Sequence, residues 1–259
     1  MSADLHLLAR AEDLLSRARN GVIAYTAFLT PAEQHALSRA MPFARAEMRT
    51  DGGYSNAERA RVFFLPSYLL DMDEQTLAEC LADTYEECLL PLQIKGSGFR
   101  ELHHKDYLGA VLNLGIERDA IGDLCVTDKH TAVLFCDCVI ARFLAESLTR
   151  VANDAVRVTR ATLPEGFDGG KKFQAVSDTV ASPRADSVVA ALANLSRERA
   201  QALFREKLVE IDYEIAEKPD QQLEAPCVIV IRGKGKFIIR SLCEQTKKGR
   251  IRLLADKYL

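Results

Sequence analysis

The sequence predicts an α+β protein of several domains, and three observations indicate this. Apolar residues at helical spacing alternate with short apolar runs typical of strands, one central segment has the order β-α-β-β-α-β, and a Gly- and Pro-rich stretch precedes a closing segment of different charge. With 259 residues, 48% of them hydrophobic, the chain is long enough for more than one core. The predicted parts are an N-terminal α/β region (1–75), a ferredoxin-like middle domain (76–161), a linker and lead-in (162–180) and a C-terminal domain of a helix pair plus a small antiparallel sheet (181–259).

The N-terminal region begins with an amphipathic helix in the first 20 residues, where leucine and alanine recur at the 3.6-residue period. Residues 30–33, Thr-Pro-Ala-Glu, form a capping box that predicts the start of a second helix. Between Ala46 and Pro66 the pattern predicts a strand, a turn and a strand, because Gly52 and Gly53 suit a turn and the residues around Phe63 suit a buried strand.

The middle domain is predicted to follow a helix that begins after Asp73. Its order matches the split βαβ, ferredoxin-like sandwich that RNA-binding modules of the RRM kind share. An exposed aromatic pair for base stacking is not evident, and topology alone does not indicate RNA binding. The expected strands lie near 92–94, 124–127, 131–136 and 155–158, and the expected helices at 106–114 and 139–148.

The C-terminal domain is predicted from two helix caps and three strand-like runs. Ser182, followed by Pro183, is expected to cap the first helix, and Ser196 the second. Strands are expected at 209–213, 227–232 and 236–242, with Gly233-x-Gly235 joining the last two as a hairpin.

Composition favours a soluble, cytoplasmic protein. No apolar run approaches the roughly 18 residues of a membrane span, and the acidic residues near the N-terminus do not suit an export signal. The seven cysteines are an odd number without a Cys-x-x-Cys pair, so a disulfide framework is not expected. Cys136-x-Cys138 is interpreted as alternating cysteines on a buried strand in preference to a metal site, for which His130 is the only nearby further ligand.

Charge is unevenly distributed along the chain. The net charge is −3 overall, but residues 181–259 hold 15 Lys and Arg against 11 Asp and Glu, a net +4, which leaves −7 for residues 1–180. Residues 228–252 hold eight basic residues and one acid, Glu244, a net +7. This segment is a candidate surface for a polyanion.

Four stretches of the C-terminal domain carry a resemblance to a known module. They are Pro-Arg-x-Asp at 183–186, Leu-Ser-Arg-x-x-Ala-Gln-x-Leu at 195–203, Val-x-Ile-Asp at 209–212 and Arg-Gly-Lys-Gly-Lys-Phe at 232–237. Together they resemble the S4 domain, an RNA-binding module of ribosomal proteins, tRNA synthetases and pseudouridine synthases. The chemistry suits RNA, because the two helices present arginines to phosphate and the second begins with free backbone N–H groups.

Further stretches extend the resemblance over nearly the whole chain. Asp-Gly-Gly-Tyr-x-x-Ala-Glu-Arg at 51–59, the long segment at 104–123 that contains Leu-Gly-Ile-Glu-Arg-Asp, and Thr-Lys-Lys-Gly-Arg-Ile-Arg at 246–252 look like the bacterial YlmH family. The resemblance implies an RNA-binding protein with an RRM-like middle domain and a C-terminal S4 domain. It further implies association with tRNA or rRNA on the large ribosomal subunit, in rescue of stalled nascent chains, and a link to cell division.

Departures from the usual S4 pattern guide the choice of site residues. Ala185 replaces a leucine, Lys207 stands where glycine usually ends the second helix, and Leu208 and Glu210 stand where basic residues are common. The helix arginines and the hairpin lysines are therefore weighted above the first strand. The predicted RNA-binding residues are Arg184, Ser196, Arg197, Arg199, Gln201, Arg205, Lys207, Arg232, Lys234, Lys236, Lys247, Lys248 and Arg250.

Each cluster also has a simpler interpretation. The arginines at 197 and 199 could form a solvated helix face, and the lysines at 234 and 236 could blunt an exposed strand edge. Arg118, Asp119 and Asp123 could hold RNA or pair internally to fix a loop, and internal pairing is favoured.

No catalytic, metal or cofactor site is predicted, and the protein is not expected to be an enzyme. Adjacent histidines at 103 and 104 point apart in any regular element, and Asp106 suits a helix cap. The alternative is an RNA-modifying enzyme of the pseudouridine synthase type with an appended S4 domain, but its Gly-Arg-Leu-Asp type segment is absent. A methyltransferase would need a glycine-rich loop between a strand and a helix, whereas Gly233-x-Gly235 joins two strands.

Overall fold

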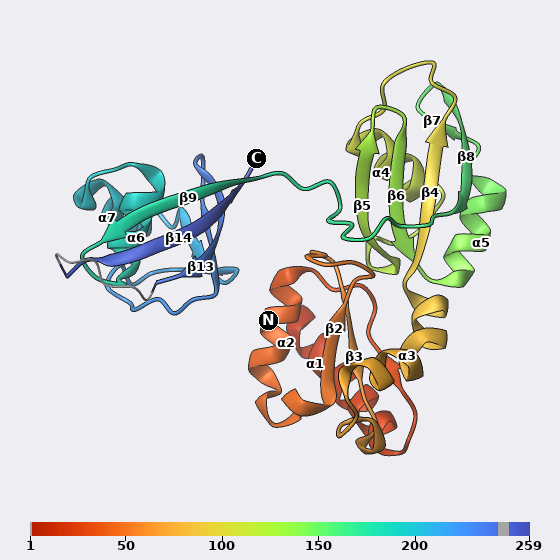
Figure 1. Cartoon of the computed structure of the whole chain (residues 1–259), viewed down its shortest axis with the longest axis horizontal. Coiled ribbons are helices and arrows are strands. Elements are labelled where there is room, and N and C mark those ends of the chain that lie inside the picture. Colours follow the sequence, from red (N-terminus) through yellow and green to blue (C-terminus); the bar gives the residue numbers. More distant parts are fainter. Residues whose placement is uncertain (1, 243–248) are drawn as a thin grey trace. The chain divides into compact units, whose positions relative to one another are not determined.

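The computed structural model describes residues 2–242 and 249–259, with side chains from residue 5 onward. The chain divides into two compact units, Met1–Gly170 and Lys171–Leu259, each with helices and antiparallel sheet (Figure 1). The predicted mixture of helix and sheet is therefore confirmed. Over the described residues, no helix is long and apolar enough to cross a bilayer.

The first part of unit 1 is a small three-stranded sheet with two helices packed against it. The predicted capping box begins the second helix: Glu33 N donates to Thr30 Oγ1 (3.3 Å), and Thr30 N donates to Glu33 Oε2 (2.7 Å). The sheet is antiparallel in the order β1-β3-β2, and its buried strand β3 includes Phe63. The elements are α1 (Ser2–Arg19), β1 (Ala24–Tyr25), α2 (Pro31–Ala40), β2 (Met48–Asp51) and β3 (Arg61–Phe64).

The rest of unit 1 has the predicted β-α-β-β-α-β order, preceded by the expected helix that Asp73 caps. Its antiparallel sheet has the strand order β5-β6-β4-β8-β7. The elements are α3 (Glu74–Cys88), β4 (Leu90–Gly96), α4 (His104–Leu112), β5 (Ile121–Asp128), β6 (Thr131–Cys136), α5 (Cys138–Ser147), β7 (Arg150–Val151) and β8 (Asp154–Arg160).

Two local predictions in this part are corrected by the structure. Cys136 is buried at the end of β6, but the strand stops there because Asp137 caps α5 by accepting from Ile140 N (2.8 Å), so Cys138 is exposed at the start of a helix. Asp106 helps to cap α4, but from within the first turn and not from the position before the helix. The helix begins two residues earlier than expected, and the Asp106 carboxylate forms part of a capping box in which it accepts from His103 N (2.9 Å).

Both faces of the sheet that contains β4, β5 and β6 are covered. One face packs against α4 and α5 around residues such as Tyr107 and Leu134. The other face packs against the first part of the unit, where Phe135 of β6 shares a core with Phe28 and Phe63. Tyr54 from the loop after β2 stacks on Phe135 at 5.1 Å between ring centroids. The sheet face on which an RRM would stack bases is therefore filled with the protein's own side chains.

Unit 2 is a six-stranded antiparallel sheet in the order β11-β10-β12-β13-β14-β9, with α6 and α7 side by side against one face (Figure 1). The expected hairpin joins β12 to β13, with Ile231 paired to Gly235. The elements are β9 (Phe173–Val180), α6 (Ala185–Ala193), α7 (Arg197–Arg205), β10 (Val209–Ile211), β11 (Glu214–Ile215), β12 (Cys227–Ile231), β13 (Gly235–Ser241) and β14 (Ile251–Tyr258).

The predicted linker over 162–180 is too long. Its first part is irregular, and Leu163 and Phe167 pack against the core of unit 1. Its second part is strand β9, which pairs with β14 over all eight residues and belongs to unit 2. The strand was missed because its partner lies at the other end of the unit, so no local turn signals the pairing. Unit 2 accordingly begins at Lys171 and not at Ala181.

The cap of the first C-terminal helix is also different from the prediction. Helix α6 begins after Arg184, which occupies the cap position without a side-chain cap, so Ser182 lies before the helix. Ser196 caps α7 as predicted, and its hydroxyl accepts from Arg199 N (3.3 Å).

Candidate nucleic-acid interface

The predicted RNA-binding residues of unit 2 gather mainly at the two ends of α7. Arg184, Arg197 and Gln201 meet near its N-terminal end, whereas beyond its C-terminal end Arg232 is bonded to Leu208, the residue after Lys207. A helix of nine residues is about 14 Å long at 1.5 Å per residue. The interface therefore consists of two basic groups separated by roughly the length of α7.

The N-terminal group is organised by Asp186, whose side chain is completely buried. Arg184 donates from Nε to Oδ1 (3.2 Å) and from Nη2 to Oδ2 (3.1 Å), and Arg197 donates from Nε to Oδ2 (3.0 Å). Gln201 Nε2 adds a further bond to Oδ2 (3.0 Å). We call these four residues the Asp186 cluster. It joins the entry of α6 to the first turns of α7 and thereby fixes the angle at which the two arginines emerge.

The electrostatics of the Asp186 cluster favour the ionised carboxylate. Burial alone would raise the pKa of Asp186, but hydrogen bonds from Arg184, Gln201 and Arg197 outweigh burial and hold the pKa well below its usual range. The arginine side chains themselves remain accessible, with 32% of Arg184 and 54% of Arg197 exposed. Each guanidinium has five N–H donors, and Asp186 engages only part of them. The same arginine can therefore brace the helix pair and contact a phosphate.

A groove beside α6 brings another predicted residue close to the Asp186 cluster. Its volume is about 350 Å³, and both Arg197 and Arg250 line it. Arg250 donates from Nη2 to the backbone oxygen of Thr179 on β9 (2.5 Å), which fixes it at the start of β14. The small side chains of Ala190 and Ala191 form part of the groove, so a backbone of another molecule could approach closely there.

The C-terminal group lies where the hairpin meets the end of α7. Arg232 N donates to the backbone oxygen of Leu208 (2.9 Å), which ties the start of the hairpin turn to the residues after the helix. Lys207 adopts φ +55°, the left-handed region usual for glycine at a helix end. Its ammonium lies 3.3 Å from Glu217, but both side chains are more than 60% exposed, so this pair contributes little stability.

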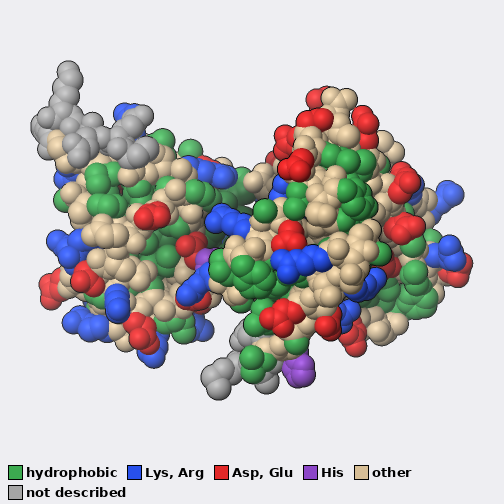
Figure 2. All heavy atoms as spheres, turned by 90° about the horizontal axis from the view of Figure 1, so that it is seen from below, with side chains coloured by type: hydrophobic (Ala, Val, Ile, Leu, Met, Phe, Trp, Pro, Cys, Tyr) green, Lys and Arg blue, Asp and Glu red, His purple; other side chains and the backbone are tan. Residues whose placement is uncertain are grey.

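The remaining predicted RNA-binding residues differ in position and exposure. Arg199 and Arg205 are exposed on α7, and Lys234 is exposed in the hairpin turn. Lys236 of β13 points to the sheet face away from the helices, since its neighbour Phe237 is buried in the core beneath them. Lys247 and Lys248 lie outside the described residues. On the face shown in Figure 2, Lys and Arg side chains are interspersed with Asp and Glu in both units.

The acidic and basic residues around β5 serve the fold of unit 1, as the internal-pairing interpretation expected. Asp123 accepts from Tyr54 Oη (2.6 Å), Glu58 N (2.7 Å) and Arg59 N (3.0 Å). Arg118 donates to the backbone oxygens of residues 121 and 122, each at 3.0 Å. The bonds of Asp123 fasten the loop after β2 to the sheet, whereas those of Arg118 fix the turn that leads into β5.

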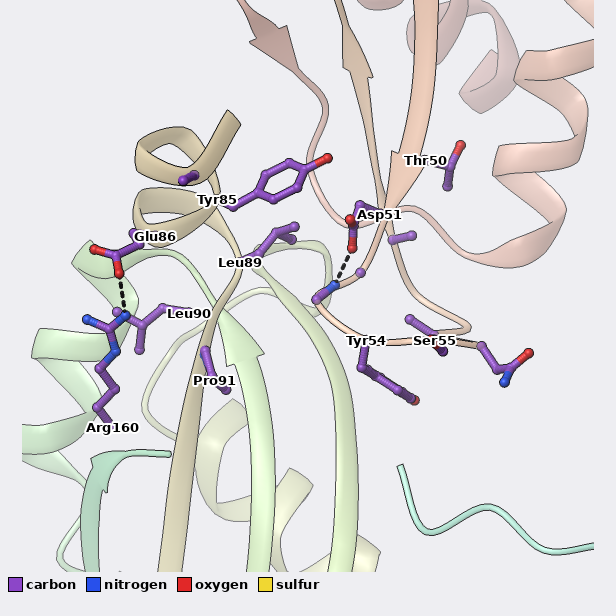
Figure 3. Close-up of a pocket in the computed structure, with 16 residues that line it drawn as sticks. Thr50, Asp51, Tyr54, Ser55, Tyr85, Glu86, Leu89, Leu90, Pro91 and Arg160 are labelled. Atoms are coloured by element: carbon purple, nitrogen blue, oxygen red, sulfur yellow. Dashed lines mark hydrogen bonds and ion pairs between the residues drawn. The ribbon is translucent and has the colours of Figure 1, made fainter. Parts of the chain in front are cut away.

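A larger cavity, of about 610 Å³, lies in unit 1 between the loop after β2 and the end of α3 (Figure 3). None of the predicted RNA-binding residues lines it. Its charged groups bond to neighbours: Glu86 pairs with Arg160 at 2.9 Å, and Asp51 accepts from Gly53 N at 2.7 Å. The cavity thus contributes nothing to the two basic groups of unit 2.

Sequence reasoning missed the residues that position the site. Asp186 entered the sequence analysis only as part of a motif, although an acid between the small residues Ala185 and Ser187 of an otherwise apolar helix signals a buried partner for nearby arginines. An aromatic and basic row on the free face of the unit 2 sheet was missed as well. Its members, Phe173, Tyr213, Lys236 and Tyr258, are far apart in the chain.

Comparisons with known proteins agree with this organisation. The sequence profile described as "Putative RNA-binding domain in YlmH" matches residues 83–165. Ribosome-associated protein quality control protein P2 of Bacillus subtilis (strain 168) is 28% identical over 233 residues, which is 90% of this chain and 86% of that protein.

The solved structure of cell division protein ylmH from Streptococcus pneumoniae has a similar fold. It superposes with a TM-score of 0.50 at 17% sequence identity, over 64% of this chain and 95% of that chain. The matching profile, the relative from Bacillus subtilis and the solved structure agree with one another, and by them the chain is similar to proteins of the YlmH family.

Proposed function

We propose that this protein is a non-enzymatic RNA-binding factor that acts on the ribosome, and that unit 2 is an S4 domain and its main RNA contact. The observation that carries the proposal is the pair of basic groups at the two ends of α7, one of them braced by the buried Asp186. Arginines held in a fixed geometry suit phosphate contacts, because less conformational entropy is lost on binding.

The relative from Bacillus subtilis supports the ribosome as the place of action, since its name describes a ribosome-associated quality control protein. We propose the same role here, with contacts to rRNA or tRNA on the large subunit during rescue of stalled nascent chains. Such a role would place the protein in the cytoplasm.

The middle part of unit 1 has a more limited share in this proposal. The matching RNA-binding profile covers α3 to β8, but the sheet face used by RRM modules is buried there against Phe28 and Phe63. Any RNA contact of unit 1 would therefore use its edges or loops. Unit 1 would then serve chiefly to position the protein on the ribosome.

The proposal is tested by exchanging surface arginines in matched pairs. Arg199 and Arg205 are exposed on α7, and Arg10 and Arg17 are exposed on α1 of unit 1. If each α7 arginine neutralises one phosphate, the double alanine variant should flatten the slope of log K against log salt for tRNA or rRNA by roughly 1.4 to 1.8. The α1 double variant should bind as the unchanged protein does.

Sedimentation of cell lysate through a sucrose gradient gives the matching readout in cells. The unchanged protein and the α1 variant should travel with the large subunit, and the α7 variant should shift toward the top as salt rises. A protein that stays at the top of the gradient at every salt concentration, or equal behaviour of both double variants, would contradict the proposal.

A further inference from the structure

Among the described residues of unit 2, helices pack against one face of the sheet, and the other face has no helix of this unit on it. Along β12 and β13 buried and partly exposed residues alternate, so that Ile229 and Phe237 enter the core under α6 and α7 while Val228 and Ile238 point the other way. Leu254 and Ile215 lie on this second face with 38% and 54% of their surfaces exposed. We call it the open face.

Aromatic and basic side chains form a row across the open face. Tyr258 of β14 is paired directly with Phe173 of β9, and their rings meet edge to face at 4.8 Å between centroids. Lys236 of β13 holds its ammonium 4.6 Å from the Tyr258 ring centroid and 5.5 Å from that of Tyr213. We call these four residues the stacking row. It runs from the turn after β10 to β9, about 19 Å at the usual strand spacing.

The stacking row continues into basic groups already described. Lys236 follows the hairpin turn that carries Lys234, so the row begins beside the C-terminal group of the interface. Arg252 is exposed on the same face, opposite Thr179, but six residues from Tyr258 along β14 and therefore away from the row. One cation, Lys236, thus lies within the row, and Lys234 lies in the turn that precedes it, where a phosphate backbone would pass.

From these observations we infer that the open face binds an unpaired segment of RNA, with bases stacked on Tyr258, Phe173 and Tyr213 and phosphates near Lys236 and Lys234. Every base has a flat face that an aromatic ring can stack on, whereas the bases of a duplex already stack on one another. The ammonium of Lys236 beside two of the rings favours a polyanion over an apolar protein surface. The inference rests on the proposed function and adds the class of RNA and a second contact surface.

The ammonium of Lys236 has a defined part in this inference. In the structure it lies over two rings, a cation–π arrangement that keeps the rings separated. A lysine side chain has four rotatable carbons and three donors, so it can move from the ring face to a phosphate as a base takes its place. The row is thus shaped before the RNA arrives.

The test uses the full chain and two probes, an unstructured oligouridine of about 12 nucleotides and a tRNA. Tyr258→Ala should weaken oligouridine binding by roughly 5- to 150-fold, the loss that corresponds to one stacked base. Tyr258→Phe keeps the ring and should bind within about twofold of the unchanged protein. The affinity for tRNA should be nearly the same in all three, because the helix pair is untouched.

Tyrosine emission gives an independent measurement, because the chain has seven tyrosines and no tryptophan. Stacked bases should quench part of this emission in the unchanged protein. Tyr258→Phe should bind the oligouridine but show a smaller quench, a result that an effect on folding alone cannot produce. Circular dichroism shows whether each variant is folded. If Tyr258→Ala is unfolded, the test relies on the quench measured with Tyr258→Phe.

The outcomes separate this inference from the proposed function. If tRNA binds and Tyr258→Ala leaves oligouridine affinity unchanged, or the quench is equal in Tyr258→Phe, the open face is not an RNA surface and a protein partner becomes its best occupant. If neither probe binds the unchanged protein, the proposed function itself is wrong.

Discussion

The sheet that contains β4, β5 and β6 has side chains packed against both of its faces, whereas the described residues of unit 2 place helices on one face of its sheet only. The first sheet has the β-α-β-β-α-β order of RNA-binding modules, and yet its aromatic residues, Phe135 above all, are internal. The second sheet has a different topology and carries its aromatic row toward solvent. The order of the strands therefore does not by itself say whether a sheet has a face open to a nucleic acid.

The largest expected effect comes from the covered sheet. Phe135 is completely buried between the two parts of unit 1, so Phe135→Ala should lower the free energy of unfolding by about 3 to 5 kcal/mol through lost burial and a cavity. Tyr258→Ala on the open face should cost only about 1 kcal/mol. Calorimetry of the full chain, with hydrogen exchange to assign each transition to a unit, measures both. Equal losses in the two variants would mean that the open face is packed as firmly as the covered one.

A smaller effect is expected where the helices dock on the unit 2 sheet. Asp186→Ala leaves Arg184 and Arg197 without their shared carboxylate and should destabilise unit 2 by about 2 kcal/mol, because the arginines can still be solvated. Glu198→Gln, on the exposed side of α7, serves as the control and should change the free energy of unfolding little. Denaturant titration followed by hydrogen exchange of α6 and α7 measures the loss.

The pH dependence follows from the lowered pKa of Asp186. The folded-state pKa lies below the unfolded value of about 4, so the ionised carboxylate stabilises unit 2 fully at higher pH, and this contribution is lost as the pH falls below about 4. The unchanged protein should therefore lose more stability than Asp186→Ala between about pH 4 and pH 2. Stability is measured for both proteins as the pH is lowered. If both lose the same amount, this role for Asp186 is ruled out.

The smallest expected effect is a gain in the free energy of unfolding of unit 2. Lys207 ends α7 with φ +55°, where a side chain costs free energy and glycine does not. Lys207→Gly should raise the free energy of unfolding of unit 2 by about 0.5 to 1 kcal/mol. Glu217→Gln removes the exposed ion pair alone and should be nearly neutral. A loss of stability in Lys207→Gly would show that the lysine side chain contributes packing that offsets its backbone strain.

Features encoded within a few residues were predictable from the sequence. The capping box at Thr30, the cap at Ser196 and the hairpin at Gly233 each depend on side chains and backbone groups that are close neighbours in the chain. The internal role favoured for Asp123 agrees with its bonds to the loop after β2, although its partners there, Glu58 N and Arg59 N, are distant in the sequence.

Features that depend on distant partners were not predictable. Strand β9 was interpreted as part of a linker because its partner, β14, ends the described chain, and Asp186 meets its arginines only after α6 and α7 have packed. The covering of Phe135 by residues of the first part of the chain, including Phe28, has the same cause. In each case the spacing of apolar residues, with period 2 or 3.6, predicts a strand or a helix but does not predict which other element it will pack against.

The pairing of β9 with β14 brings the two ends of unit 2 together. Tyr258 lies opposite Phe173, and Leu259 N donates to the backbone oxygen of Lys172 (3.1 Å). Chain ends that lie side by side are the condition for circular permutation. A short peptide from residue 259 to residue 171, with new ends opened in the exposed turn at Gly233, would keep every strand in its place. The order in which these strands are synthesised could then be changed without changing the fold they make.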